Sequence, residues 1–216
     1  MPRLRQVRLD EVTDPLVRET YVKYFEGRDP VSDPGTSTGT PGSWWTTFAL
    51  DPELFMVMRL RQKWQYSASR ILSPRLREVA LARTGWARGS KFVYSQHAKG
   101  MRMVGYTEEQ IANIGSWSSV NCFDDSERLV LGYADDLVLG GGRVSDQRFA
   151  ALKALLSDVG ILELTFLICT YDNSATLCKA LRIEFDDRPD EIEEVLSSNS
   201  TEHFSEQVAI LQSMND

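Results

Sequence analysis

Residues 72–114 read LSPRLREVALARTGWARGSKFVYSQHAKGMRMVGYTEEQIANI, and this stretch decides the fold. Ser73–Pro74 is a capping residue followed by proline, which is typical of the start of a helix. A Gly-Ser break at residues 89–90 ends this run, and a second run begins directly after it. So short a break lets the second helix fold back against the first. We therefore predict an antiparallel helix pair over residues 74–88 and 90–104.

Helical signals continue on both sides of this pair. Asp51–Pro52 repeats the cap-and-proline start, and Thr107–Gln110 and Asp124–Glu127 have the spacing of capping boxes. Ser145 opens a further helix, and the apolar segment at residues 161–181 is predicted to be the longest buried helix. Strand patterning is nearly absent, so we predict an all-α fold.

The chain is predicted to be a single domain over residues 1–216, with its core at residues 45–181. Residues 28–43 are rich in Pro, Gly, Ser and Thr and form a predicted loop. Loops of this length often act as lids, although a plain connector is an equal alternative. A polar tail occupies residues 186–216, with one predicted helix that begins at Thr201.

The composition restricts the classes of function. The chain has 216 residues and a formal net charge of -7, which argues against a nucleic-acid-binding surface. It contains no run of the roughly 18 apolar residues that a membrane span needs, and its N-terminus lacks the apolar core of a secretory signal. Its three cysteines form no Cys-x-x-Cys pair, so neither a disulfide framework nor a zinc site is expected. We predict a cytoplasmic protein without nucleic-acid or membrane partners.

One of the two histidines lies in the middle of the predicted helix pair. On a helix, Ser90, Val93, Tyr94 and His97 have the spacing i, i+3, i+4 and i+7 and share one face. Glu78 lies on the preceding helix, which the short break can bring beside His97. A carboxylate next to an imidazole fixes the tautomer of the ring, as a general acid or base requires. A structural role in the core is the alternative for such a histidine.

The quoted stretch resembles the carboxymuconolactone decarboxylase and AhpD-like superfamily. Similar segments lie upstream, WTTFALDPELF at residues 45–55, and downstream, GILELTFLICTYDNSATLCKAL at residues 160–181. The resemblance thus extends over residues 45–181, and it implies an AhpD-like helical bundle that assembles as a homo-trimer or homo-hexamer. The residues that carry it within the quoted stretch are Arg77–Glu78, Arg83, His97 and the turn GYTEE at residues 105–109.

Two departures from the family pattern restrict the chemistry. The peroxidase branch has a Cys-x-x-Cys motif before the histidine, whereas this chain has Ser90 and Val93 at those positions. Without thiols there is no thiolate nucleophile and no reversible disulfide. The decarboxylase branch usually has a glutamate in the turn before the histidine, where this chain has Phe92 and Val93. We therefore expect no dithiol peroxidase chemistry and a substrate that differs from simple carboxymuconolactone.

The resemblance implies a cofactor-independent acid/base enzyme, a lyase or an isomerase, in the catabolism of aromatic compounds. Its substrate would be a small lactone or a related unsaturated carbonyl compound or carboxylate. Such a lactone can itself take up the electrons that remain when carbon dioxide leaves, so neither a metal nor an organic cofactor is expected. We expect His97 to transfer the proton, Glu78 to set its tautomer and Tyr94 to donate a hydrogen bond to the developing oxyanion.

Five further residues are candidates for substrate binding. Arg77 and Arg83 could hold a substrate carboxylate through a bidentate fork, with structural ion pairs as the alternative. The other three candidates are Ser90, Val93 and Trp86. Three other functions stay open: a non-catalytic oligomeric binding protein, a metal-binding protein and a peroxidase. Metal binding has little support, because His203 in the tail is the only other histidine.

Overall fold

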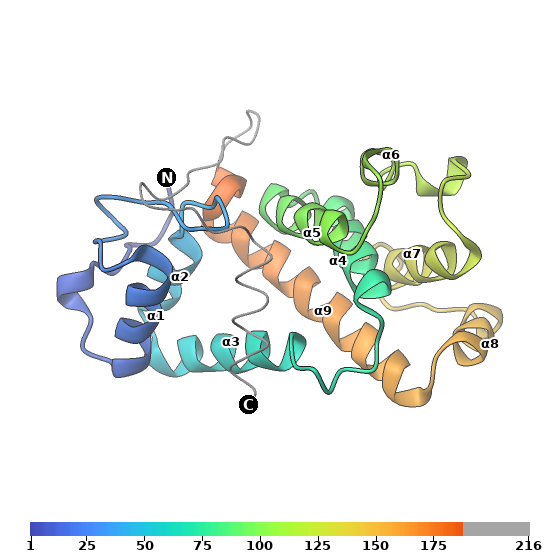
Figure 1. The fold of residues 1–216 in the computed structure, drawn as a ribbon, viewed down its shortest axis with the longest axis horizontal. Helices are drawn as coiled ribbons and strands as arrows, with labels where there is room; N and C mark the ends of the chain where they lie inside the picture. Colours follow the sequence, from blue (N-terminus) through green and yellow to red (C-terminus); the bar gives the residue numbers. More distant parts are fainter. Residues whose placement is uncertain (188–216) are drawn as a thin grey trace. The chain divides into compact units, whose positions relative to one another are not determined.

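The computed structural model describes residues 1–187. Figure 1 shows the α-helices of these residues, labelled in chain order from α1 to α9. No strand occurs in this described part of the chain. The prediction of an all-α fold is therefore confirmed. No helix within the same residues is long and apolar enough to cross a membrane. The tail helix that we expected from Thr201 lies outside the described residues.

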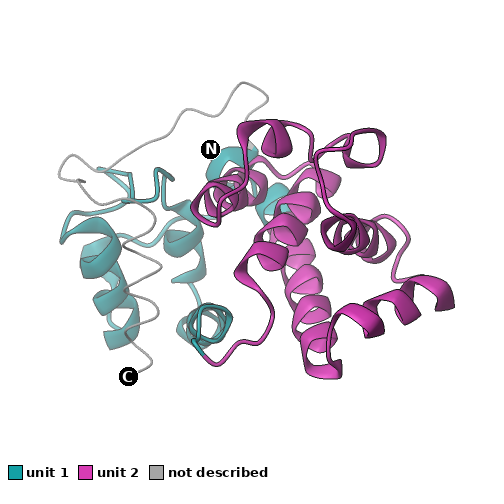
Figure 2. Ribbon diagram, turned by 45° about the vertical axis from the view of Figure 1, so that its right-hand side comes forward, with its two compact units in different colours: residues 1–68, 178–216 teal, residues 69–177 magenta. Residues whose placement is uncertain are grey.

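The described residues form two compact units, which are coloured separately in Figure 2. Unit 1 contains residues 1–68 and the described residues from 178 onward, and unit 2 contains residues 69–177. The longest helix, α9 (Asp158–Leu181), begins in unit 2 and ends in unit 1. That residues 1–216 make a single domain remains a prediction.

Helices α1 and α3 of unit 1 begin where an aspartate is followed by a proline. The carboxylate of Asp14 accepts a hydrogen bond from the Val17 amide at 3.0 Å, and Asp51 caps the next such helix in the same way. The predicted start at Asp51–Pro52 is confirmed, and the same signal at residues 14–15 opens a helix that we did not predict. The elements of unit 1 are the 3-10 helix Leu9–Glu11, α1 (Pro15–Phe25), α2 (Ser43–Phe48), α3 (Pro52–Gln65) and the 3-10 helix Glu184–Asp187.

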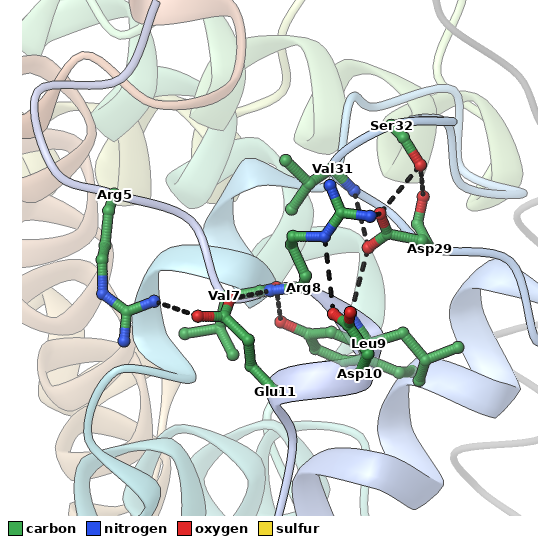
Figure 3. A network of polar contacts seen from close by, with 10 residues as sticks. Arg5, Val7, Arg8, Leu9, Asp10, Glu11, Asp29, Val31 and Ser32 are labelled. Carbon is green, nitrogen blue, oxygen red and sulfur yellow. Dashed lines mark hydrogen bonds and ion pairs between the residues drawn. The ribbon is translucent and has the colours of Figure 1, made fainter.

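Asp29 fastens the first part of the loop at residues 28–43 to the N-terminal segment (Figure 3). Its carboxylate accepts hydrogen bonds from the Leu9 amide at 3.1 Å and from the Ser32 hydroxyl at 2.8 Å. It also forms an ion pair with Arg8 at 3.2 Å. Contacts of this kind hold the backbone of a segment that has no regular structure of its own.

Glu184 holds the other end of this loop. Its buried carboxylate accepts hydrogen bonds from the amides of Gly42 at 3.1 Å and Trp44 at 2.5 Å. These amides precede or begin α2, so the carboxylate supplies acceptors that the start of a helix lacks. Both ends of the loop are thus tied within unit 1. Its action as a lid remains a prediction.

Unit 2 is built around the predicted helix pair. The break between its two helices contains Gly89, whose left-handed backbone (φ of 63°) ends the first helix. A Cβ at Gly85 would collide with the backbone of Tyr94 on the second helix, so the close approach of the pair requires glycine there. The elements of unit 2 are α4 (Pro74–Arg88), α5 (Lys91–Met103), α6 (Glu108–Ala112), the 3-10 helix Trp117–Ser119, α7 (Asp125–Val138), α8 (Asp146–Leu155) and the greater part of α9.

The helix starts that we predicted in unit 2 are also present. Thr107 and Gln110 form a capping box at the start of α6, and Asp124 and Glu127 form another at the start of α7. Ser145 caps α8 through its hydroxyl. Helix α4 packs against both α5 and α7 in this unit. The central antiparallel pair is therefore confirmed as the core of the fold that surrounds His97.

Candidate active site

His97 and Glu78 lie side by side within unit 2. Nδ1 of His97 is 2.8 Å from Oε2 of Glu78, which is a hydrogen bond between α5 and α4. Both side chains are buried, each residue being only 3% exposed. The turn between the two helices thus brings together residues that are 19 positions apart, as the sequence predicted. The catalytic roles that we expected for them remain predictions.

Glu78 is a carboxylate in this arrangement. Burial would raise its pKa, but the hydrogen bonds and the positive charges of His97 and Arg77 together hold the pKa of Glu78 below its usual range. Arg77 donates from Nε to Oε1 of Glu78 at 2.8 Å, so one guanidinium and one carboxylate balance each other beside the imidazole. An ionised carboxylate can only accept hydrogen bonds, and therefore Nδ1 of His97 is the donor.

This assignment leaves Nε2 as the ring nitrogen that is not bonded to Glu78. Within residues 1–187 the bond to Glu78 is the only hydrogen bond that the imidazole makes. When Nδ1 carries the proton of a neutral imidazole, Nε2 has a free electron pair and acts as a base. After it has taken up a proton, the same nitrogen acts as an acid. That His97 acts as such an acid or base remains a prediction.

Gly100 makes room for the Glu78 carboxylate on α5. It lies one turn after His97, and a Cβ at this position would collide with Oε2 and the carboxyl carbon of Glu78. Only glycine leaves the carboxylate this close to the helix that carries His97. We did not predict Gly100 as a site residue, although a glycine inside a helical pattern is a signal of close packing.

The ring of Tyr171 on α9 packs against the imidazole ring of His97. The two ring centroids are 4.3 Å apart and the ring planes are almost perpendicular, at 87°. Perpendicular rings are a favourable arrangement for an aromatic pair. We did not predict this contact, because Tyr171 is distant in sequence and no local spacing connects it with His97. Its only signal was its place in the segment 160–181, which resembles the family.

The hydroxyl of Tyr94 has a partner within the protein, and the oxyanion role that we expected for it remains a prediction. The hydroxyl donates a hydrogen bond to the backbone carbonyl of Ile111 at 3.1 Å and makes none to His97. Burial is the largest of the effects that raise the pKa of Tyr94. The structure therefore places this phenol on α6, as an anchor between two helices of unit 2. Tyr171, and not Tyr94, is the tyrosine in contact with the imidazole.

Ser90 and Val93 together form the start of α5. The Ser90 hydroxyl accepts a hydrogen bond from the Val93 amide at 3.2 Å, which makes Ser90 the N-cap of the helix that carries His97. Both residues are buried. The positions that hold redox cysteines in the peroxidase branch are thus used here for capping and packing. A contact of either residue with substrate remains a prediction.

Every arginine of α4 is paired with a carboxylate. Arg83 donates to both oxygens of Asp135, at 2.6 and 3.0 Å, and its third nitrogen donates to two backbone carbonyls. The ion pairs on this helix are Arg75–Glu127 at 2.7 Å, Arg77–Glu78 at 2.8 Å, Arg83–Asp135 at 2.6 Å, and Arg88–Asp172. These donors of Arg83 are therefore used within the protein, and its expected contact with a substrate carboxylate remains a prediction.

Trp86 lies on the outside of unit 2. It is 47% exposed, its ring lies beneath the Arg83 guanidinium at 4.6 Å, and it covers Gly115 so closely that a Cβ there would collide with it. Its expected contact with substrate remains a prediction. Among residues 1–187, no group of three or more His, Cys, Asp and Glu side chains is arranged to hold a metal ion.

Comparisons with known proteins agree with this fold. The carboxymuconolactone decarboxylase family matches residues 54–136. A protein of unknown function from Agrobacterium tumefaciens, proposed to be the antioxidant defence protein AhpD, has a similar crystal structure with a TM-score of 0.56 and 23% sequence identity. The match covers 63% of this chain and 92% of that one. A search of curated proteins found no match. The match to the family model thus covers a stretch, residues 54–136, that contains both Glu78 and His97.

Proposed function

We propose that this protein is an acid/base enzyme that needs no cofactor and acts on a small lactone or a related unsaturated carbonyl compound. In this proposal His97 transfers a proton to or from a carbon atom that is conjugated with the carbonyl group. The observation that carries the proposal is the buried hydrogen bond of 2.8 Å between Nδ1 of His97 and Glu78. It supports an imidazole with a fixed tautomer and an available Nε2.

The charges beside His97 suit a reaction that passes through an enolate. The charges of Arg77 and Glu78 compensate each other beside the imidazole. When Nε2 removes a proton from the carbon next to the carbonyl, the electrons of the C–H bond move onto the carbonyl oxygen. The imidazolium then carries a positive charge next to the enolate and returns the proton to another carbon of the conjugated system. No electron acceptor is required for this exchange.

The paired arginines of α4 favour a substrate that carries no carboxylate. Arg83, which we expected to bind such a group, uses its donors on Asp135 and on the carbonyls of Ile114 and Gly115. A bidentate fork is the usual way in which arginine recognises a carboxylate. We therefore propose isomerisation of an uncharged lactone as the first reaction to test. Decarboxylation, after which the family is named, is the second, because it also leaves an enolate that must be protonated.

Deuterium incorporation tests this proposal with a simple probe. α-Angelica lactone is an uncharged β,γ-unsaturated lactone that becomes the conjugated isomer by proton transfer alone. In D₂O we expect the protein to speed the appearance of the deuterated conjugated isomer in proton NMR spectra, and we expect His97→Gln to abolish this effect. The decarboxylation arm uses a butenolide with a ring carboxylate as the substrate, and the release of carbon dioxide is measured. Equal rates with and without protein in both arms would reject the proposed enzyme.

The burial of His97 favours a second candidate function. Because this residue is only 3% exposed, it could serve as a core residue of a non-catalytic binding protein that retains the family fold. Such a protein would bind a carbonyl compound without exchanging its protons. The two candidates are separated by the same probe: a binding protein shifts the NMR signals of the lactone but leaves its deuterium content at the uncatalysed level.

A further inference from the structure

We propose that Tyr171 is a positioning residue for His97, whose imidazole it holds in the orientation that exposes Nε2 to a substrate. The inference rests on the proposed function of His97, but the orientation of the ring can be measured without a substrate. Tyr171 contacts the imidazole with a centroid distance of 4.3 Å and a plane angle of 87°. The contact comes from α9, whereas Glu78 comes from α4 and His97 itself from α5.

A hydrogen bond at one nitrogen does not fix a histidine ring by itself. The torsion between Cβ and the ring of histidine has a broad energy minimum, so a ring held only at Nδ1 can still tilt about that contact. A perpendicular aromatic ring in van der Waals contact opposes the tilt, because the imidazole would either collide with it or lose the contact. Glu78 and Tyr171 therefore restrict different motions of the same ring. Together they define where Nε2 points.

The residue after Tyr171 ties this turn of α9 to α4. The carboxylate of Asp172 forms a two-pronged ion pair with Arg88, in which Nη2 donates to Oδ2 at 2.9 Å. Helix α4 also supplies Glu78, so the two groups that contact the imidazole are attached to one pair of connected helices. Bidentate arginine–carboxylate pairs constrain geometry more than a single hydrogen bond does. This arrangement is suited to holding the tyrosine ring at a constant distance from His97.

Nitrogen-15 NMR of the histidine side chains measures the proposed effect directly. The chain has only two histidines, so a His203→Gln variant assigns the signals of His97 without further labelling. For the neutral imidazole, we expect widely separated nitrogen-15 shifts for a protonated Nδ1 and an unprotonated Nε2. Tyr171→Phe keeps the ring and should keep this separation. Tyr171→Leu removes the ring and should narrow the separation, because a loosened imidazole samples both tautomers.

A matched control separates positioning from a general loosening of the fold. Tyr133→Leu removes another tyrosine ring, whose hydroxyl bonds to Thr165 on α9 at 2.6 Å, whereas the ring paired with the imidazole of His97 is that of Tyr171. We expect its His97 shifts to equal those of the wild type. If Tyr171→Leu fails to fold, Tyr171→Met provides the same comparison with a longer side chain.

Two results would overturn the positioning role. The first is an unchanged shift separation in a folded Tyr171→Leu or Tyr171→Met variant, and the second is an equal narrowing in Tyr133→Leu. Activity provides a separate readout. Tyr171→Leu should lower kcat for the lactone probe about 2- to 12-fold at similar KM, which is the interaction energy of a perpendicular ring pair converted to a ratio of rates. Tyr171→Phe keeps the ring and should keep the wild-type kcat. Failure of the enzyme proposal would instead be recognised by a wild-type protein that does not exchange protons in the lactone at all.

Discussion

The carboxylate of Glu78 lies directly against the backbone of Gly100, one helical turn after the histidine to which it is hydrogen-bonded. The site therefore depends on the absence of a Cβ atom at residue 100. A side chain at residue 100 would occupy the position of Oε2 and push the carboxylate away from Nδ1 of His97. Such dependence is directly accessible to mutation.

Gly100→Ala should destabilise the protein and weaken the pair of Glu78 and His97. Alanine in a helix interior is favoured over glycine by about 1 kcal/mol, but overpacking commonly costs about 1–3 kcal/mol. We expect the free energy of unfolding, measured by urea denaturation, to fall by about 1–2 kcal/mol, because a displaced buried carboxylate also loses a hydrogen-bond partner. Gly160→Ala is the control, since a Cβ there makes only ordinary contacts from 3.4 Å. Equal stability of the two variants would contradict the close packing at Gly100.

Glu78 should make the stability of the protein sensitive to acid. Its pKa in the folded protein lies below the usual value near 4.5, so the unfolded chain takes up the proton first as the pH falls. The stabilisation is fully present above the unfolded pKa and is lost progressively as the pH falls through the folded pKa. Glu78→Gln should therefore flatten the acid limb of the unfolding free energy. Glu108→Gln, at an exposed ion pair with Arg102, should change it far less.

Arg83 should prove important for folding and not for substrate recognition. Its removal leaves two backbone carbonyls without their Arg83 donor and leaves the Trp117 indole as the remaining donor to the Asp135 carboxylate, and breaking a largely buried pair costs about 3 kcal/mol. We expect Arg83→Met to lower the unfolding free energy by that amount in denaturation experiments. Arg102→Met, at the exposed pair, should cost about 1 kcal/mol or less. A stable Arg83→Met protein with a raised KM would instead support the carboxylate fork expected from the sequence.

Tyr94→Phe should change stability slightly and proton transfer very little. The phenol bonds to the Ile111 carbonyl, and a hydrogen bond of this type contributes about 0.5–1.5 kcal/mol. We expect the free energy of unfolding in urea to fall by an amount in that range. The kcat for the lactone probe should stay close to that of the wild type. A large fall in kcat with unchanged stability would return Tyr94 to the oxyanion role that the sequence suggested.

Local signals in the sequence predicted much of the fold. Pro74 and the glycine at residue 89 marked the two ends of α4, because the backbone conformation at a helix end depends on the residues there, although the Ser73 side chain makes no capping hydrogen bond. The turn after this helix made the proximity of Glu78 and His97 predictable. Asp14–Pro15 is an equally strong signal, and applying it uniformly would have predicted α1.

The remaining features of the site depend on contacts between distant parts of the chain. The contact of Tyr171 with His97 requires α9 to pack beside α5, and the pairing of Arg83 with Asp135 requires α7 to lie beside α4. Helical spacing gives the face on which a residue lies, but it does not give the partner that its polar atoms find. For this reason Tyr94 was placed near His97 by spacing, whereas its hydroxyl bonds to Ile111.

The most direct test of the proposed function is the rate at which the protein introduces solvent deuterium into α-angelica lactone, measured for the wild type and for His97→Gln. Glutamine keeps a polar side chain of similar length but cannot exchange a proton at neutral pH. A positioned general base contributes about 100- to 10,000-fold to such a reaction, so we predict a loss of that size with an unchanged helical content. A variant that retains the wild-type rate within a few-fold would contradict the proposal that His97 transfers the proton.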